Sequence, residues 1–344
     1  MLIIGTIIAA GFCSGKEIET YFASYGFFSL FFIPLLFVLY YYIFKLFLSF
    51  GKKERFQNIY DLNKKIFVRG AKCSNVLLFF IYLIFTSAMF AGIREIGQNF
   101  SNFTSIIFLL LAFVIAFVVL LKPFDVLKKI NSIFIPFLAA IMMILCVVAM
   151  FSFSKGNLAF QVEHGYLMFF NPVIYACQGL AVAYFILVKA GENLTDKQIK
   201  LSAFLSSFLL CSMQILVIVV LNFMPELANN PMPLLTLAFK TYFPLGIVYL
   251  FVLFVAILTT LFATSRSLAE ITNTKIKNAR LSAFLSLLFA FILSFFGFDK
   301  IIEYLYPVIG LIGFCILMLL IYRLFFVNRF QFENAKIHDT RKDT

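Results

Sequence analysis

Apolar stretches of about 20 residues recur along the chain and are separated by short polar segments. A helix of this length crosses a hydrocarbon core roughly 30 Å thick. The stretches lack the period-two alternation that is typical of membrane β-barrel strands. The pattern therefore predicts an all-α integral membrane protein. Ten spans are expected, at about residues 2–24, 27–50, 73–98, 103–121, 130–153, 166–189, 201–223, 245–266, 280–297 and 301–326.

The composition excludes a soluble domain. Of the 344 residues, 63% are hydrophobic and 13% are charged, and a soluble fold of this length has too little interior for that much apolar surface. The six cysteines lie in or beside apolar spans without a CxxC spacing, which favours small buried hydrophobes over a disulfide or a zinc site. The first span lacks a preceding basic segment and runs on toward the next helix, so we do not interpret it as a cleavable signal.

Most of the Lys and Arg residues lie in connections on one predicted side of the membrane. Of the 28 Lys and Arg residues, 22 fall in alternate connections, within 51–72, 122–129, 189–200 and 266–280 and in the tail from Arg323. Because basic residues gather on the cytoplasmic side, both termini are predicted to be cytoplasmic. The formal charge of +12 therefore indicates the lipid bilayer as a partner, and no nucleic acid.

Ten spans with both termini in the cytoplasm divide into two halves of five spans, and the two halves start from opposite sides of the membrane. We expect a single transmembrane domain over 1–344, with repeat one at about 1–153, repeat two at about 166–326 and a tail at 327–344. Inverted-repeat transporters require this arrangement. An even-span channel or membrane enzyme shares it, so the count alone leaves these classes open.

The first span contains glycines and charges where a bilayer makes both costly. Gly11 and Gly15 are followed directly by Lys16 and Glu17. Irregular backbone at membrane depth is tolerated where it lines a cavity or is buried in protein, so these residues predict a break between two half-helices. Ser14 is expected to cap the second half in a capping box with Glu17. The alternative is a face of small residues that packs against a neighbouring helix. The predicted break comprises Ala9, Ala10, Gly11, Phe12, Cys13, Ser14 and Gly15.

The first span of the second half has an interruption of its own. Asn171 and Pro172 are followed by the stretch Tyr175-Ala176-Cys177-Gln178-Gly179. Interrupted helices at corresponding positions of two halves are the best sequence indicator of a transporter's binding site. Glu17, a carboxylate within an apolar region, is a functional hypothesis by default. Glu19 is instead expected to face water at the outer end of the first span.

These residues carry a resemblance to a known family. The opening GTIIAAGFCSGKEI resembles the first helix of the YkvI-like family of bacterial membrane proteins, whose pattern is close to G-T-x-x-G-A-G-F-A-S-G-x-E. That family belongs to the amino acid–polyamine–organocation superfamily, whose members resemble LeuT in fold. The resemblance implies a five-plus-five inverted repeat with broken first and sixth helices. Ala9 stands where the family has glycine. Met1 leaves only about ten residues, roughly 15 Å of helix, before Gly11, so we expect a short cytoplasmic half-helix or a start that is assigned late.

The same resemblance implies an ion site between the first and eighth spans. The eighth span reads FVAILTTLFATS, similar to the sodium-coupled pattern of an alanine followed three and four residues later by two hydroxyls. By that likeness, sodium is bound by the carbonyls of Gly5, Ile8 and Ala256 and by the hydroxyls of Thr259 and Thr260. Such an all-oxygen shell suits an alkali cation. The alternative is that both hydroxyls bond the preceding helical turn.

An amino acid is the substrate class that the resemblance implies. The N-terminus of a half-helix near Ser14 would present free amides and a positive dipole to a carboxylate. Apart from sodium as the coupling ion, no cofactor is implied. Further candidates for binding the substrate are Tyr82, Tyr175, Gln178 and Gly179.

Three charged residues are candidates for gating or proton transfer. Lys16 and Glu303 are candidates for an extracellular gating pair, and Glu17 is the candidate proton carrier. The alternative for the first two is solvation at the interface, where an ion pair contributes on the order of 0–1 kcal/mol.

Competing functions need residues of other kinds. An intramembrane protease needs a Ser–His dyad, an Asp pair or HExxH, whereas His164 and His338 fall in a loop and in the tail, so we expect no enzyme. A channel usually needs a repeated filter or rings of charge, and no such motif is visible. A proton-coupled carrier of another solute, and a sensor that keeps the fold without transport, stay open beside a sodium-coupled transporter.

Overall fold

The computed structural model describes residues 4, 7–8, 10–54, 56, 62–64, 71–122, 125–152, 169–227 and 230–322. Every regular element within these ranges is helical, which confirms the all-α prediction. The elements are α2 (Ala10–Ser14), α3 (Lys16–Tyr21), η1 (Ala23–Phe32), α4 (Ile33–Lys53), α6 (Ala71–Gln98), α7 (Asn102–Leu120), α8 (Asp125–Ser152), α9 (Asn171–Gly191), α10 (Asp196–Phe223), η4 (Pro225–Leu227), α11 (Pro233–Thr241), α12 (Phe243–Ile276), α13 (Ala279–Leu293), η5 (Ser294–Phe296), α14 (Phe298–Lys300), η6 (Ile301–Leu305) and α15 (Tyr306–Tyr322).

Local polar residues and prolines determine where several helices begin. Thr195 and Gln198 form a capping box at the start of α10, in which Gln198 N donates to Thr195 Oγ1 at 3.3 Å. Ser101 caps α7 by accepting a hydrogen bond from Thr104 N at 3.0 Å. Prolines occupy the first turn of α4, α9, α11 and α12, where the amide that proline lacks would have no intrahelical partner.

Eight helices of the described chain are long and apolar enough to cross a membrane. They correspond to the predicted spans two to four and six to ten, and Pro136–Ser152 is a shorter apolar helix within the fifth. The first span is divided into α2 and α3, each only one or two turns long. The largest boundary error is in α12, which continues past the predicted end at 266 to Ile276.

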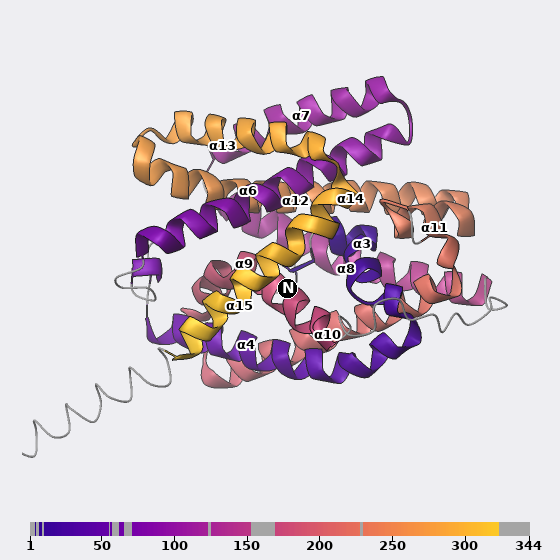
Figure 1. The fold of residues 1–344 in the computed structure, drawn as a ribbon, viewed down its shortest axis with the longest axis horizontal. Helices are drawn as coiled ribbons and strands as arrows, with labels where there is room; N and C mark the ends of the chain where they lie inside the picture. The colour runs from indigo at the N-terminus through magenta and orange to yellow at the C-terminus, as the bar shows by residue number, and fades with distance from the viewer. Residues whose placement is uncertain are drawn as a thin grey trace, which may run out of the picture.

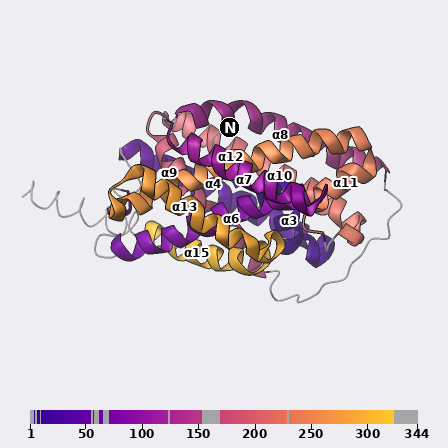
Figure 2. The same ribbon diagram turned by 90° about the horizontal axis from the view of Figure 1, so that it is seen from above.

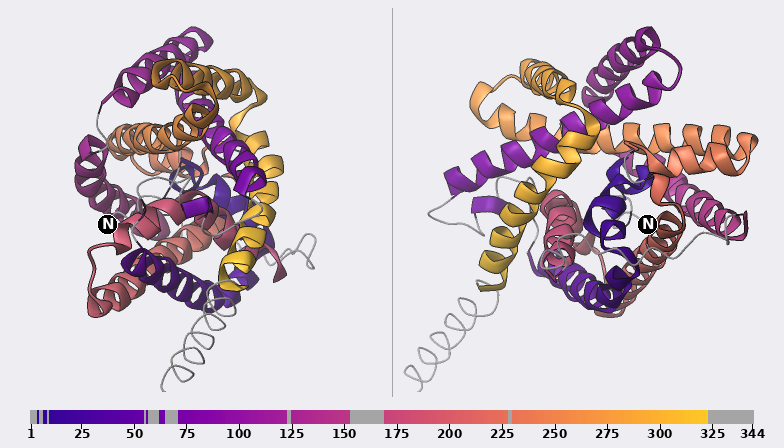
Figure 3. Two further views of the ribbon diagram at one scale, coloured as in Figure 1. Left: turned by 90° about the vertical axis from the view of Figure 1, so that its left-hand side faces the viewer. Right: turned by 45° about the vertical axis from the view of Figure 1, so that its right-hand side comes forward.

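The helices form two groups that lie on either side of the first segment, which we define as the described residues from Ile4 to Tyr21, including α2 and α3. One group consists of α6, α7, α12 and α13, in the upper part of Figure 1, and the other of η1, α4, α9 and α10, in the lower part. Figure 2 shows α8 and α15 on opposite sides of the assembly. The two views in Figure 3 place the short indigo helices of the first segment between the groups. There α2 contacts α6 and α12, while α3 contacts α9 and α10.

The contact between α9 and α15 depends on two glycines of α15. A Cβ atom on Gly310 would lie 2.6 Å from the Ile174 carbonyl oxygen, and one on Gly313 would overlap the carbonyl of Cys177. The two backbones therefore touch directly, as small residues permit between membrane helices.

Candidate functional site

Among its described residues, the backbone of the first segment departs from helical geometry at Ile8 and at Gly15. Ile8 is non-helical, and Gly15, between α2 and α3, has φ 84° and ψ −8° in the left-handed region. A Cβ atom on Gly15 would be strained by that backbone and would also lie 2.7 Å from Leu234 Cγ of α11. The first span is therefore interrupted as predicted, but Ala10–Ser14, which were predicted to lie within the break, form the helix α2, and Gly15 is the residue that turns the chain.

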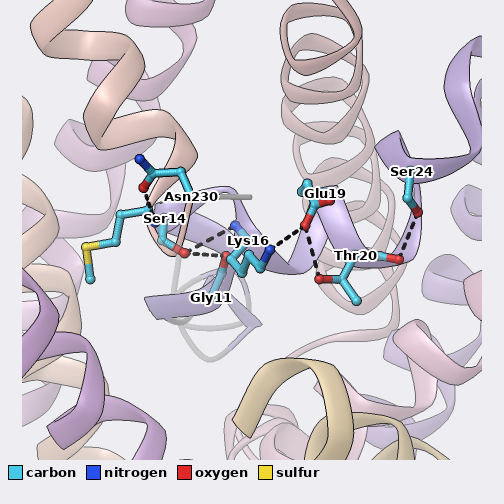
Figure 4. A network of polar contacts seen from close by, with 8 residues as sticks. Gly11, Ser14, Lys16, Glu19, Thr20, Ser24 and Asn230 are labelled. Atoms are coloured by element: carbon cyan, nitrogen blue, oxygen red, sulfur yellow. Dashed lines mark hydrogen bonds and ion pairs between the residues drawn. The ribbon is translucent and has the colours of Figure 1, made fainter. Parts of the chain in front are cut away.

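The hydrogen bonds of Ser14 differ from the predicted capping box. Its hydroxyl donates to the Gly11 carbonyl at 3.0 Å and accepts from Lys16 N at 3.2 Å (Figure 4). The N-cap of α3 is Gly15, which has no side-chain cap. Because the helix starts one residue later than predicted, Glu17 stands at the second helical position, whereas a capping carboxylate belongs at the third. The predicted capping box is wrong, and the Lys16 amide is already bound by the Ser14 hydroxyl.

Lys16, which was predicted to pair with Glu303, has an ion-pair partner within its own helix. Lys16 Nζ forms an ion pair with Glu19 Oε2 at 2.8 Å, one turn along α3 (Figure 4). Glu19, which was expected to face water, is only 13% exposed. Thr20 Oγ1 donates to the same carboxylate oxygen at 3.4 Å. Glu303, the predicted partner of Lys16, is an exposed residue of η6, whereas the ion pair of Lys16 with Glu19 lies within α3.

Glu17 is buried, with 3% of its surface exposed, and folds back against Gly11. A Cβ atom on Gly11 would overlap the carboxylate, so the missing side chain at this position makes room for Glu17. Among the described residues, Glu17 Oε1 has no hydrogen-bond partner. The Tyr175 hydroxyl lies close to Glu17 and to the Gln214 amide, yet it also lacks a partner of hydrogen-bond geometry.

The other residues of the predicted break face the protein core. Phe12 and Cys13 are fully buried, and the Tyr249 hydroxyl of α12 donates to the Cys13 carbonyl. This bond joins the first segment to the eighth span. Ala9 lies outside the described residues, and for Ala10 only the backbone, at the start of α2, is described.

The sixth span is one continuous helix through the stretch that was expected to be interrupted. The backbone is helical from Asn171, where Pro172 lies in the first turn, to Gly191. The prediction of an interruption at Tyr175–Gly179 is therefore wrong, since these described residues are helical. The physical reason is packing: a Cβ on Gly179 would contact Ile7 Cγ2 at 3.4 Å, and the small residues of this stretch let the first segment and α15 approach α9.

Tyr175, Gln178 and Gly179 nevertheless lie beside the first segment, as the site prediction requires. Tyr21 of α3 donates from its hydroxyl to Gln178 Oε1 at 2.8 Å. The rings of Tyr21 and Tyr175 are 5.3 Å apart between centroids, tilted by 50°. The predicted residues of α9 therefore meet the first segment, through Tyr21, which was not predicted as a site residue.

A small cavity lies at this meeting point. Its volume is about 10 Å³, which is at the lower limit for one water molecule. Sites for small molecules are usually about 300–1,000 Å³, so side chains or helices must move before a solute can enter. The cavity is lined by Ile7, Glu17, Phe85, Tyr175, Gln178, Gly179 and Val182.

Three of these lining residues were not predicted from the sequence. Ile7, Phe85 and Val182 are apolar residues in spans made mostly of apolar residues, and no sequence signal separates them from ordinary packing positions. Tyr82, which was predicted, does not line the cavity. It is buried on α6 and donates from its hydroxyl to the Val182 carbonyl at 3.2 Å, so it connects α6 to α9 behind the cavity.

The hydroxyls of the expected ion site lie within one turn of α12. Thr259 Oγ1 and Thr260 Oγ1 both donate to the Ala256 carbonyl at 3.0 Å, which is the helical back-bonding considered as the alternative. Their lone pairs remain available to a cation, and both residues are buried. Ile8 is buried where the first segment is non-helical, whereas Gly5 lies outside the described residues.

Comparisons with known proteins place the chain among membrane proteins. No family profile matches it. It is 23% identical over 317 residues, or 90% of each chain, to the protein of Bacillus subtilis (strain 168) described as "Uncharacterized membrane protein YkvI". The structure is similar to the inward-facing conformation of Mhp1, with a TM-score of 0.66 and 12% identity, over 94% of this chain and 77% of that one. The resemblance to YkvI-like proteins is confirmed, and the fold is LeuT-like.

Proposed function

We propose that this chain is a secondary active transporter, not an enzyme, in a bacterial cytoplasmic membrane with both termini inside. It carries an amino acid or a related small amine together with sodium, by alternating access between the two sides. In transporters of this kind, one helix group rocks against the other around a site near the middle of the membrane.

The observation that carries the proposal is the position of the interrupted first segment. It lies between the two helix groups, where it contacts α9 on one side and α12 on the other. Both the small cavity and the hydroxyls of Thr259 and Thr260 are next to helices that it touches. A movement of one group against the other would therefore change the cavity and the ion site together.

Two alternatives predict different results. Glu17, buried at the cavity, favours proton coupling as the second candidate, with its carboxylate as the proton carrier. A sensor on the same fold would bind the solute without moving it. Uptake measurements separate the three.

The experiment is uptake of a mixture of labelled amino acids into proteoliposomes that contain the purified protein. An inward sodium gradient should drive accumulation, and an ionophore that collapses the gradient should abolish it. Accumulation driven by a pH gradient without sodium would favour the proton carrier. Binding in detergent without accumulation under either gradient would favour the sensor.

A matched pair of variants tests the sodium site. Thr259→Ala/Thr260→Ala removes two of the five proposed oxygens, and sodium and substrate should then no longer tighten each other's binding. Thr264→Ala is the control, because Thr264 is a buried hydroxyl one turn further along α12 that donates to the Thr260 carbonyl at 3.0 Å. The control should keep the full sodium dependence. If the double variant keeps it as well, the ion site lies elsewhere.

A further inference from the structure

Four buried side-chain oxygens of the described residues lack a hydrogen-bond partner, and they belong to one cluster. The atoms are Glu17 Oε1, Tyr175 OH, Gln214 Oε1 and Tyr306 OH. They come from α3, α9, α10 and α15, yet Tyr175 interacts with both Glu17 and Gln214, and Tyr306 interacts with Glu17. Glu17 and Tyr175 line the cavity, and because buried polar groups are almost always paired, the unpaired atoms of these two residues point to a ligand.

The chemistry of the cluster selects the kind of ligand. Two of the four atoms are hydroxyl oxygens. The other two are the carboxyl oxygen of Glu17 and the amide oxygen of Gln214, and an amide oxygen or a carboxylate oxygen only accepts hydrogen bonds. The neighbouring cation, Lys16, is bound to Glu19 at 2.8 Å. A buried carboxylate is stabilised by a cation that also donates hydrogen bonds, and an ammonium group supplies one charge and three donors.

Aromatic rings around the cluster fit the same ligand. Tyr175 and Phe85 line the cavity, and Phe85 stacks on Tyr306 with centroids 4.7 Å apart. Aromatic faces attract ammonium groups, most strongly where water is excluded. A carboxylate at this place would instead face Glu17 and find no compensating cation among the cavity-lining residues.

We infer that Glu17, with Tyr175 and Gln178, binds the ammonium group of the transported solute, so that the substrate class is ammonium-bearing compounds for which a carboxylate is dispensable. This inference rests on the proposed function, since it names the substrate class of the same cavity. Glu17 is then a substrate-binding residue, and not a gate or a proton carrier.

Matched sets of ligands test the inference directly. Each set contains an amino acid, the amine left by removing its carboxylate, and the acid left by removing its amine. We would use alanine with ethylamine and propionate, leucine with isoamylamine and isocaproate, and phenylalanine with phenethylamine and hydrocinnamate. Binding is measured by thermal shift and calorimetry on the purified full chain in detergent, with sodium present. The inference expects that in at least one set the amino acid and the amine bind and the acid does not.

Two variants locate the effect at Glu17. Glu17→Gln keeps the shape but removes the charge, and should weaken binding of the amine by at least about 30-fold, as loss of one partner of a buried charge pair does. The same variant should melt at a higher temperature than the parent without ligand, because a buried ionisable group whose Oε1 has no hydrogen-bond partner is replaced by a neutral one. Glu19→Gln is the control, since Glu19 is held by Lys16, and should leave the ratio of amine to acid binding unchanged.

The outcomes separate this inference from the proposed function. Binding of the acid without the amine, an unchanged amine affinity in Glu17→Gln, or no binding by any compound of the panel would each overturn the inference. So would a Glu17→Gln protein that loses only its sodium dependence, because the carboxylate would then bind the ion. Amine binding without uptake into proteoliposomes would leave the inference standing and overturn the transporter.

Discussion

The left-handed turn at Gly15 makes a strong prediction about stability. In Gly15→Ala, an L-residue at φ 84° costs about 1–2 kcal/mol relative to a right-handed conformation. The added Cβ lies 2.7 Å from Leu234 Cγ, a fully buried residue of α11, and overpacking of this kind costs about 1–3 kcal/mol. The lower entropy of the unfolded chain returns about 0.4–1 kcal/mol. We expect a net loss of about 3 kcal/mol.

A double-mutant cycle separates the two contributions. Leu234→Ala alone should cost about 2–5 kcal/mol through the cavity it leaves in the core. Combined with Gly15→Ala, it removes the atom that the new methyl group meets, so the double variant should be less destabilised than the sum by about 1–3 kcal/mol. The backbone cost at Gly15 remains in both backgrounds.

The assay is reversible unfolding in mixed micelles, followed by circular dichroism because the chain has no tryptophan. Gly92→Ala is the control. Gly92 lies within α6, and a Cβ there would meet only side-chain ends, Ile257 Cδ1 and Phe298 Cε2, each at 3.3 Å. Better helix propensity and mild crowding should nearly cancel, for a change below about 1 kcal/mol. A Gly15→Ala protein as stable as this control would refute both the turn and its contact with Leu234, and strict additivity in the cycle would refute the contact.

Three further predictions concern the position of Glu17, the hydrogen bond of Tyr82 and the orientation of the chain in the membrane. Gly11→Ala should displace the Glu17 carboxylate and abolish ligand binding in a folded protein, and Glu17→Asp should partly restore binding because the shorter side chain leaves room for the methyl group; no restoration would contradict the contact. Tyr82→Phe should cost about 0.5–1.5 kcal/mol in the same unfolding assay, with ligand binding unchanged, since it loses the hydrogen bond to the Val182 carbonyl and Tyr82 does not line the cavity. Cysteines introduced in loop 51–72 should be labelled from the cytoplasmic side, and labelling from outside would overturn the orientation.

The helical architecture was predictable because hydropathy reports the burial of whole segments in lipid. The position of the first break was predictable for a related reason, since glycines and charges are costly in an apolar span unless something compensates them. The geometry of this break was not predictable from the sequence. Whether Ser14 or Gly15 ends the turn depends on one φ angle, and Leu234, more than 200 residues away in the sequence, packs against that turn.

The sixth span shows where sequence reasoning is ambiguous. Small residues permit an interrupted helix and equally permit close packing, because both need backbone that is not covered by side chains. The stretch Tyr175–Gly179 is helical, and its backbone packs closely against Ile7 and Gly313. Those neighbours come from other helices, and no local pattern in the span identifies them.

The details of the first segment have a common effect, which is to place one carboxylate. If Gly15 continued the helix, side chains would follow one another at about 100° around a single axis, and residue 17 would point in another direction. The left-handed turn changes that direction, and Gly11 leaves space for the carboxylate beside the backbone. A segment selected only for packing would be more stable with an apolar residue at position 17, since a buried carboxyl group whose Oε1 has no hydrogen-bond partner is costly. A carboxyl group kept in so unfavourable a place is most simply explained by a ligand of positive charge, which the cavity admits only when the helix groups move.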